Sequence, residues 1–436
     1  MNPAHAAAPA ANPASGLPVW RQVRWWILGL LFCVTVINFV DRQSLSIVAP
    51  VLRDSLRLTN TDYGRIVAAF QAGMMIAEFP MGLLMDRKGV RFGFGFAVLW
   101  WSIANGLHAL ARTMLQFSLL RFALGAGECG NFSGGMKVIS QWYPPKERAF
   151  AVGIFNGGSM IGSIIAPPLL VYVTLRMGWH AAFLLPSVLG GLWVIAWLFL
   201  YHAPEEHPHM TPWELGYIQS GRESELSRPL RNSELLRFRQ TWGLILCRFL
   251  VGPVVQFYIY WMPEYLYRER GLSLQSIGLL AWVPFLFGDA GSITGGWFAG
   301  YLIKKGFPVD RARKITMRIA ACCCVASLAV SAAHSLPAAL AWICFVLFGH
   351  TAVSANMFAA ISDVFPAGAV GRVTALTGIA GGFSGVLFPM LTGALVDRIS
   401  YWPVFLIAGF MPLIGCTLLF LLAGKLQPLT IKEQPL

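Results

Sequence analysis

Two adjacent residues of opposite charge lie inside a stretch that is otherwise apolar. Asp41 and Arg42 belong to the sequence NFVDRQSLS at residues 38–46, within a hydrophobic run over about 25–51. That run is long enough to cross a bilayer, where each charge costs roughly 2.5–3.5 kcal/mol on insertion scales. Charges retained at this cost indicate a functional site.

A second apolar segment contains a further pair of opposite charges. Arg121 and Glu128 are seven residues apart, which places them two turns apart on one face of a helix. Asn131 continues that face three residues beyond Glu128. This spacing predicts a polar stripe that faces a cavity rather than lipid.

These four charges fit the binding of an anion coupled to proton transfer. Arg42 and Arg121 would present positive charge to an anionic substrate. Asp41 and Glu128 would exchange protons, because a carboxyl group in a partly desolvated cavity is a usable proton carrier near neutral pH. Arg42 would be released for the substrate when Asp41 takes a proton. The alternative is that the four residues form buried ion pairs that fix helix packing.

Composition places the chain among polytopic membrane proteins. Its 436 residues are 56% hydrophobic and only 12% charged. The formal charge of +13 does not indicate nucleic-acid binding, because a basic patch needs a solvated face and lysines and arginines in membrane loops explain it better. The eight cysteines show no paired CxxC spacing, so we expect neither disulfides nor a metal site.

Twelve apolar segments can be counted, six on either side of a charged stretch. This predicts an all-α fold with two six-helix bundles at 19–201 and 241–424, a cytoplasmic linker at 202–240, a disordered tail at 1–18 and a cytoplasmic tail at 425–436. The segments lie near 25–50, 62–85, 91–111, 115–140, 149–174, 180–201, 241–264, 275–303, 314–333, 338–362, 372–396 and 401–424.

The distribution of charge and an internal repeat support this division. Most of the 33 lysines and arginines fall in connections on the same side as the N-terminus, which predicts that both termini are cytoplasmic. A shift of 222 to 224 residues superimposes, for example, Gly127 on Gly349 and Pro144 on Pro366. Two related halves around a central cavity are typical of transporters.

The second half supplies polar candidates without charge. Gln256 lies among Phe257, Tyr258, Tyr260 and Trp261, where an amide beside aromatic rings suits a polyol with an apolar face. We expect Gln256 and Tyr258 to contact substrate; the alternative is an aromatic belt in contact with lipid. Further candidates from this half are Asn356 and Ser384.

Three other titratable residues in apolar segments have no assigned role. Glu78 precedes Pro80, and Asp289 lies in a glycine-rich stretch. For each, packing or gating and substrate contact remain open. His350 could titrate, but a single intramembrane histidine is more often a hydrogen-bonded packing residue.

The sequence GLLMDRKGVR at residues 82–91 joins the second and third segments. We expect a loop that acts as a conformational latch and not as a substrate site, with glycines allowing a tight turn and Asp86 capping a neighbouring helix end. The residues of this latch are Gly82, Asp86, Arg87, Gly89 and Arg91. The related stretch GYLIKKG at 300–306 has Lys304 where the acid would fall.

The latch sequence resembles the signature G-x-x-x-D-R-x-G-x-R of the major facilitator superfamily. Longer stretches resemble the anion:cation symporters, and among them the bacterial hexuronate transporters; they are NFVDRQSLSIVAP, GAGECGNFSGGMKVISQWYPPKERAFAVGIFNGGSMIGSIIAPPL, FYIYWMPEYLYRERG, AWVPFLFGDAGSITGGW and SDVFPAGAVGRVTALTG. The chain departs from these relatives at Phe39, where Tyr is usual, at Ser133, where Pro is usual, and around Gln256, where the relatives are Trp-rich.

This resemblance implies proton-driven uptake of a sugar acid anion across the bacterial inner membrane. Asp41 and Glu128 would be the proton sites and Arg42 the carboxylate anchor. Arg121 resembles the second conserved arginine of the group, and Asn156 and Ser159 resemble polar residues that line the family's cavity. No cofactor is expected beyond the proton as coupling ion, and the chain is expected to work as a monomer in the lipid bilayer. A hexuronate is the first candidate substrate, with galactonate and glucarate or galactarate as alternatives. A membrane-bound anion sensor remains a different possibility, and an enzyme is not expected.

Overall fold

The computed structural model describes residues 22–219 and 232–429, and the regular structure in these ranges is helical. The expected disordered tail at 1–18 lies outside the described residues, as does most of the C-terminal tail. The long helices before the linker are α1 (Val23–Leu56), α2 (Asn60–Lys88), α3 (Val90–Leu107), α4 (Met114–Trp142), α5 (Pro145–Met177) and α6 (Trp179–Leu200), with a short 3-10 turn η2 (His108–Leu110) after α3.

The second set of helices follows a linker that itself contains short helical pieces. The linker holds η3 (Pro204–Glu206), α7 (Pro212–Gln219) and α8 (Asn232–Leu235). The later helices are α9 (Arg239–Arg268), α10 (Leu274–Leu280), α11 (Val283–Lys304), α12 (Val309–Cys324), α13 (Ser327–Ala332), α14 (Leu336–Val364), α15 (Ala367–Arg398) and α16 (Trp402–Ala423).

Helix boundaries follow local sequence signals. Thr59 and Asp62 form a capping box at the start of α2, and the side chains of Thr113 and Ser335 cap α4 and α14. Gly178 separates α5 from α6 with a φ of 84°, a backbone conformation that glycine adopts without strain. These signals divide the apolar sequence into separate helices.

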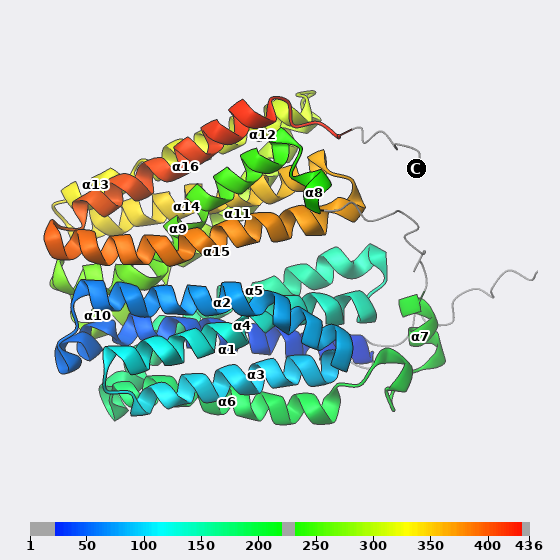
Figure 1. The fold of residues 1–436 in the computed structure, drawn as a ribbon, viewed down its shortest axis with the longest axis horizontal. Helices are drawn as coiled ribbons and strands as arrows, with labels where there is room; N and C mark the ends of the chain where they lie inside the picture. Colours follow the sequence, from blue (N-terminus) through cyan, green and yellow to red (C-terminus); the bar gives the residue numbers. More distant parts are fainter. Residues whose placement is uncertain (1–21, 220–231, 430–436) are drawn as a thin grey trace, which may run out of the picture.

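Ten spans meet a criterion of length and apolar composition for crossing a membrane within the described ranges. Helices α3 and α4 are not among them; α3, with 18 residues, just meets the length criterion but is not apolar enough, and α4 carries Arg121 and Glu128. Both nevertheless run alongside the others in the same bundle (Figure 1). The count of twelve spans therefore stays a prediction.

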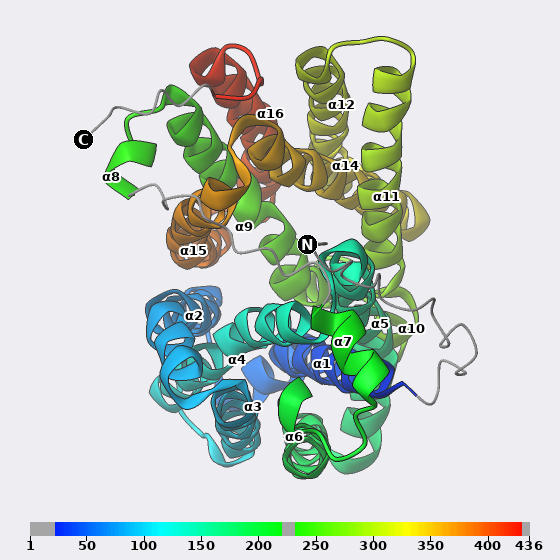
Figure 2. The ribbon, with the colours of Figure 1, turned by 90° about the vertical axis from the view of Figure 1, so that its right-hand side faces the viewer.

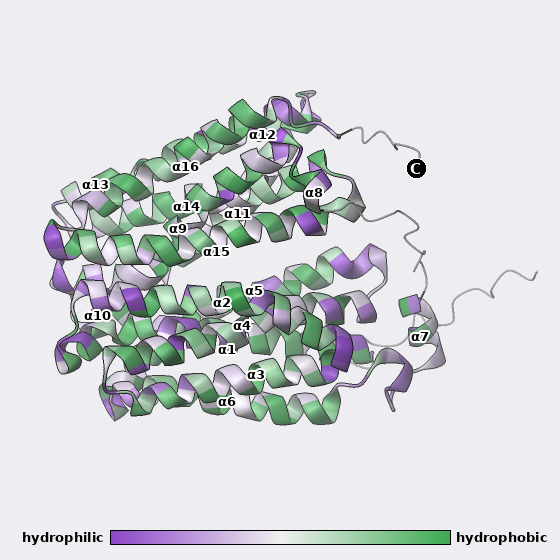
Figure 3. Ribbon diagram, in the orientation of Figure 1, coloured by the Kyte–Doolittle hydropathy of each residue, from purple (hydrophilic) through white to green (hydrophobic). Residues whose placement is uncertain are grey.

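Large apolar side chains cover the flanks of the helices, as a lipid environment requires. Phe79, Phe199 and Leu421 are each more than 70% exposed. Hydrophilic residues gather at the two ends of the bundle, while the outward faces of α3, α6 and α16 are mostly apolar (Figure 3). This distribution indicates that the bundle ends, and not its flanks, contact water.

The long helices form two groups with matching internal contacts. In the first group α4 packs on α2 and α3, and in the second α14 packs on α11 and α12 in the same way. Close approach depends on small residues: a Cβ on Gly73 would lie 2.1 Å from the Phe122 carbonyl oxygen, and one on Gly125 would lie 2.1 Å from that of Phe70. The groups, α1–α6 and α9–α16, lie one above the other in Figure 1.

Contacts between the groups involve three main helix pairs. These pairs are α2 with α15, α5 with α10, and α1 with α9. Figure 2, viewed along the helices, shows α2 beside α15 and α5 beside α11, with α1, α4 and α9 towards the middle. A site between α1, α4 and α9 is therefore enclosed by both groups.

The two ends of the bundle differ, and we name them by their contents. The end that carries α7 is called the linker face, and the end where α1 and α9 finish is called the gate face. On the linker face, the Glu214 carboxylate of α7 accepts hydrogen bonds from the backbone amides of Val23 and Arg24 at 3.2 and 3.0 Å. Arg24 also pairs with Glu147 of α5 at 3.0 Å, so the linker is tied to the first group.

Candidate functional site

A cavity of about 400 Å³ lies between the two groups of helices, within the size range of small-molecule sites. Its lining comes from α1, α2, α4 and α5 of the first group and from α9 and α15 of the second. The lining residues are Thr35, Asn38, Phe39, Arg42, Gln71, Met74, Met75, Glu78, Glu128, Cys129, Asn131, Phe132, Phe155, Asn156, Ser159, Arg248, Gly252, Gln256, Ile259, Tyr260, Gly378, Gly381 and Gly382.

Arg42 and Glu128 form an ion pair in the wall of this cavity. The Nε and Nη2 atoms of Arg42 donate to Glu128 Oε2 at 3.1 and 3.0 Å. The guanidinium also lies over the rings of Phe39 and Phe70, with centroids at 5.0 and 5.5 Å. Glu128 is only 1% exposed, so its carboxylate depends on Arg42 for charge compensation.

Asp41 points away from the cavity, although it is the neighbour of Arg42 in the sequence. Its Oδ1 atom accepts a hydrogen bond from Asn105 Nδ2 at 2.7 Å, and Asn105 also donates to the Phe183 carbonyl at 3.0 Å. Consecutive side chains on a helix point about 100° apart, so one faces the cavity and the other faces α3. Arg42 therefore pairs with Glu128 and not with Asp41, contrary to the expectation from their adjacency.

Arg121 lies beyond the cavity, deeper in the first group. Its side chain is completely buried between Phe70 and Phe183, with both ring centroids 6.0 Å from the guanidinium carbon. None of its three guanidinium nitrogens has a hydrogen-bond partner among the described residues. Two helical turns place it about 10.5 Å along α4 from Glu128, so the predicted stripe exists but only its Glu128 end reaches the cavity.

Four of the uncharged candidates line the cavity: Asn131, Asn156, Ser159 and Gln256. Asn131 donates to Thr35 Oγ1 at 3.4 Å, and Ser159 donates to the Asn156 carbonyl at 2.6 Å. The amide and hydroxyl groups therefore come from both groups of helices and converge on one space.

Three other candidates from the second group point elsewhere. The Tyr258 hydroxyl lies 2.9 Å from Ser327 Oγ in a buried contact. Asn356 accepts a hydrogen bond from Arg313 at 3.0 Å, and Ser384 donates to the Gly381 carbonyl at 3.1 Å. All three are absent from the cavity lining, and their polar atoms are used in contacts within the second group.

The structure places other polar residues in the cavity that were not among the expected site residues. Gln71 of α2 and Tyr260 of α9 line it, as do Asn38 and Arg248. Helical spacing was the signal that could have identified Tyr260, because it lies one turn after Gln256, whereas Tyr258 lies on another face of the same helix. The expectation that Tyr258, and not Tyr260, contacts the substrate was therefore wrong, because only Tyr260 lines the cavity.

Replacing these tyrosines separately tests their assignment. We expect Tyr260→Phe to weaken sugar-acid binding about 5- to 10-fold, because it removes a hydroxyl from the cavity, and Tyr258→Phe to change binding less than twofold. Isothermal titration of the purified variants measures both. Equal losses in the two variants would contradict the orientation of α9.

Five cavity residues each carry a buried polar atom that has no hydrogen-bond partner within the described ranges. The atoms are Asn38 Nδ2, Glu128 Oε1, Asn131 Oδ1, Gln256 Oε1 and the Tyr260 hydroxyl. Unsatisfied buried polar groups are costly in native structures, and a ligand that supplies donors and acceptors would satisfy them. A polyhydroxylated anion fits this combination of groups.

The three titratable residues without an assigned role lie in different surroundings. Glu78 lines the cavity and is exposed. Asp289 on α11 is not among the cavity residues, and neither is His350, whose Nε2 atom lies 2.9 Å from the Val251 carbonyl oxygen. Only Glu78 is therefore placed where it can meet a substrate directly.

The expected loop at 82–91 is almost entirely helical. Helix α2 continues to Lys88 and α3 begins at Val90, so Gly89 alone makes the turn, with a φ of 81°. Gly82 lies inside α2 and does not turn the chain. A glycine within a helix was misread as a turn signal, because the apolar residues around it support helix formation.

The charged latch residues make contacts within the first group. Asp86 forms an ion pair with Lys137 of α4, Arg91 donates to the Leu198 carbonyl of α6 at 2.5 Å, and Arg87 is exposed. These contacts hold α2, α3, α4 and α6 together on the linker face. A latch role for them remains a prediction.

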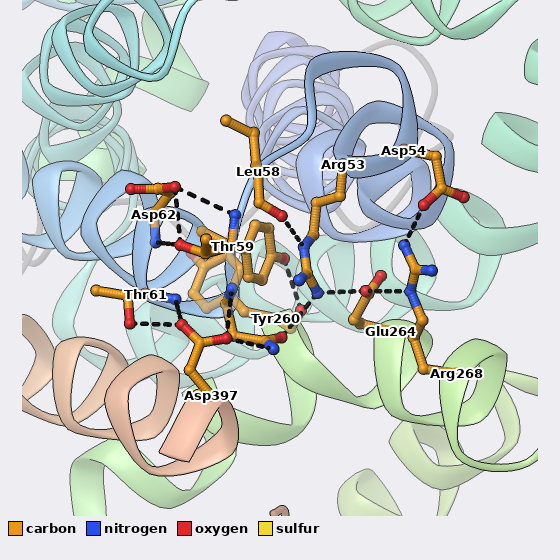
Figure 4. Close-up of polar contacts among 12 residues, drawn as sticks. Arg53, Asp54, Leu58, Thr59, Thr61, Asp62, Tyr260, Glu264, Arg268 and Asp397 are labelled. Carbon is orange, nitrogen blue, oxygen red and sulfur yellow. Dashed lines mark hydrogen bonds and ion pairs between the residues drawn. The ribbon is translucent and has the colours of Figure 1, made fainter.

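At the gate face, charged residues join the two groups of helices (Figure 4). Arg53 at the end of α1 forms an ion pair with Glu264 of α9, and Arg53 is 8% and Glu264 0% exposed. Glu264 Oε1 also accepts from Arg268 Nε at 3.1 Å, and Arg268 pairs with Asp54 of α1. Glu264 is thus the buried centre of a four-residue network across the interface.

A second cross-link at the gate face uses the N-terminus of α2. Asp397 at the end of α15 accepts hydrogen bonds from the backbone amides of Asn60 and Thr61 at 3.0 and 2.7 Å, and from both side chains at 2.8 and 2.6 Å (Figure 4). A carboxylate at a helix N-terminus is favoured by the exposed amides and the helix dipole. The second group thereby caps a helix of the first.

Polar contacts on the linker face have a different pattern. The ion pairs Lys137–Asp86, Arg24–Glu147 and Arg313–Asp363 each stay within one group of helices. At the gate face, in contrast, Tyr63 of α2 adds a hydrogen bond of 2.7 Å to the Tyr260 carbonyl of α9. The cavity is therefore sealed from the gate face by contacts between the groups.

Comparisons with known proteins agree with this architecture. The sequence matches the Major Facilitator Superfamily over residues 31–389 and 298–435. It is 31% identical to the hexuronate transporter of Escherichia coli K12 over 92% of this chain and 94% of that protein. It is 33% identical to a probable L-galactonate transporter of the same organism, over 95% of this chain and 91% of that one.

Solved structures of low sequence identity share the fold. A bacterial homologue of the human lysosomal transporter Spinster, in an inward-facing conformation, gives a TM-score of 0.73 at 17% identity, covering 92% of this chain and 97% of that one. The E. coli xylose transporter XylE, in an inward-open conformation, gives 0.71 at 15% identity, covering 94% and 98%. The helical architecture and the sequence match lead to one conclusion: this chain belongs to the Major Facilitator Superfamily of membrane transporters and is not an enzyme.

Proposed function

We propose that this transporter carries a sugar acid anion, a hexuronate first, into the bacterial cell together with protons. The observation that carries the proposal is the Arg42–Glu128 ion pair in a cavity where five residues each have a buried polar atom without a hydrogen-bond partner among the described residues. Relatives named as hexuronate, galactonate and galactarate/D-glucarate transporters support a sugar acid as the substrate class. Galactonate and the aldarates remain the alternatives.

Protonation of Glu128 is the coupling step in this proposal. Glu128 neutralises Arg42 when it is ionised, so a substrate carboxylate competes with it for the same guanidinium. When Glu128 takes a proton, Arg42 becomes available for the substrate. Asp41 has no direct contact with Arg42 in this conformation, so its proton would act through Asn105 and the packing of α3.

Transport requires the cavity to open alternately at the two ends. With the linker face in the cytoplasm, the sealed gate face is periplasmic and the structure represents an inward-facing state. Both termini are then cytoplasmic, the protein lies in the inner membrane, and the monomer contains the complete pathway. We propose that the proton is the coupling ion and that no other cofactor takes part.

Uptake into proteoliposomes tests this function. With an imposed proton gradient, acid outside, we expect labelled galacturonate or glucuronate to accumulate at least 10-fold above its level in protein-free liposomes. A protonophore should abolish the accumulation, because it removes the driving force. Binding of sugar acids without any transport would instead favour an anion sensor, and failure of every sugar acid to bind or move would overturn the substrate class.

A further inference from the structure

A second arginine lines the cavity from the opposite group of helices. Arg248 of α9 is half-buried in the lining, and within the described residues it has no hydrogen bond or ion pair. Its guanidinium carbon lies 5.2 Å from the centroid of the Phe358 ring on α14. Arg42 is already paired with Glu128, so Arg248 is a cavity cation without a carboxylate partner.

The surrounding helices make room for this side chain. A Cβ on Gly381 of α15 would lie 3.0 Å from Arg248 Nε and 3.3 Å from Arg248 Cγ. A Cβ at position 381 would push the Arg248 side chain by a few tenths of an ångström, and a branched side chain there would push it further; Gly381 itself lines the cavity. The missing side chain at Gly381 leaves space for the arginine, and the face of the Phe358 ring supports its guanidinium at the cavity wall.

The acidic residues of the cavity do not neutralise Arg248. Glu128 pairs with Arg42, and Glu78 lies on the wall formed by the first group, close enough to Cys129 for an electrostatic interaction. Neither carboxylate forms a salt bridge with Arg248 among the described residues, whereas Glu128 Oε2 and Arg42 Nη2 lie 3.0 Å apart. An unpaired guanidinium in a partly desolvated wall is unfavourable unless a ligand supplies the missing negative charge.

We propose that Arg248 binds a second carboxylate of the substrate, so that this transporter prefers a linear sugar dicarboxylate over a monoanion. One carboxylate would bind Arg42 in the first group and the other Arg248 in the second, with the hydroxyl groups between them facing Gln256 and Asn131. A ligand held by both groups also draws them together around the cavity. This inference rests on the proposed transport of sugar acids and, within that class, favours an aldarate over a hexuronate.

Galactonate and galactarate provide a matched test, because they differ by one carboxylate in place of a hydroxymethyl group. We expect titration calorimetry at pH 7.5 to show that the unmodified protein binds galactarate about 10-fold or more tightly than galactonate. Arg248→Gln should weaken galactarate binding to the level of galactonate and change galactonate binding less than twofold. Arg248→Lys should retain part of the preference, because it keeps the positive charge.

Two further variants control for indirect effects. Arg318 of α12 also lies over a phenylalanine ring, Phe420, but outside the cavity lining, so Arg318→Gln should leave both affinities unchanged. Gly381→Val should reproduce the selective loss of galactarate binding, because it displaces Arg248 without removing it. These variants separate a carboxylate subsite from a general effect of lost charge.

The outcomes distinguish this inference from the proposed function. Equal weakening of galactonate and galactarate by Arg248→Gln would overturn the second subsite and make Arg248 a common anchor. Equal affinity of the unmodified protein for both ligands would also overturn it, while leaving sugar-acid transport intact. Binding of neither ligand would overturn it as well, and the proposed function itself would be contradicted only if galacturonate and glucuronate also failed to bind.

Discussion

Glu128→Gln is expected to abolish uphill accumulation of sugar acid while leaving exchange down a concentration gradient. The amide of the variant has the shape of the carboxyl group but does not bind and release a proton. It also removes the negative charge that competes with the substrate for Arg42. Accumulation in proteoliposomes with an imposed proton gradient should fall to the level seen with a protonophore. Counterflow of labelled substrate against unlabelled substrate should stay within about fivefold of the unmodified protein.

The two assays together separate a coupling defect from misfolding. A protein that does not fold loses both activities, whereas loss of coupling removes only accumulation. Glu269→Gln provides the matched control, because Glu269 is exposed at the end of α9 and outside the cavity. Persistent proton-driven accumulation in Glu128→Gln would show that Glu128 does not carry the proton.

Glu264→Gln is expected to open the gate face. Glu264 is fully buried and pairs with Arg53 of α1 and Arg268 of α9, so its neutralisation leaves the buried Arg53 without a carboxylate partner. Breaking a buried ion pair costs about 3–5 kcal/mol. Since about 1.4 kcal/mol corresponds to a factor of ten, the equilibrium should shift roughly 100- to 4,000-fold towards the conformation open at the gate face.

Spin labels across the gate face can measure this shift. The eight native cysteines are first replaced so that labels can be attached at Ser55 in the first group and Ile399 in the second, both of which are exposed. The distance between these two labels should increase in Glu264→Gln. Asp54→Asn is the matched control on the same network. Asp54 is 53% exposed, so its pair with Arg268 is worth at most about 1 kcal/mol and the distance distribution should hardly change. An unchanged distribution in Glu264→Gln would exclude the network as a gate.

Replacement of Tyr by Phe at position 39, noted as a departure from relatives, also has a structural consequence. The Phe39 ring lines the cavity and lies 5.0 Å from the Arg42 guanidinium carbon. A ring without a hydroxyl supports Arg42 through its face but offers no hydrogen bond to a sugar. In the proposed function we therefore expect substrate recognition near Arg42 to depend more on Asn38 and Asn131, which line the same cavity.

The sequence by itself determined the class of the protein, because a bilayer imposes strong and local requirements. Apolar segments of sufficient length predict spanning helices without knowledge of their packing. The cost of a charge in lipid likewise identified Arg42 and Glu128 before any contact was known. Their placement in one cavity agrees with that reasoning.

The tertiary structure decided which side chain faces which space. Asp41 and Arg42 are adjacent in the chain but point about 100° apart, so only the packing of α3 and α4 around α1 shows that Arg42 pairs with Glu128. Tyr258 and Tyr260 are separated in the same way by the rotation of α9. The contacts of Glu264 with Arg53 and of Asp397 with Asn60 join residues more than 200 positions apart, and no local pattern predicts them. Helix rotation and the closure of one end of the bundle depend on how the two groups pack, which is a property of the whole fold.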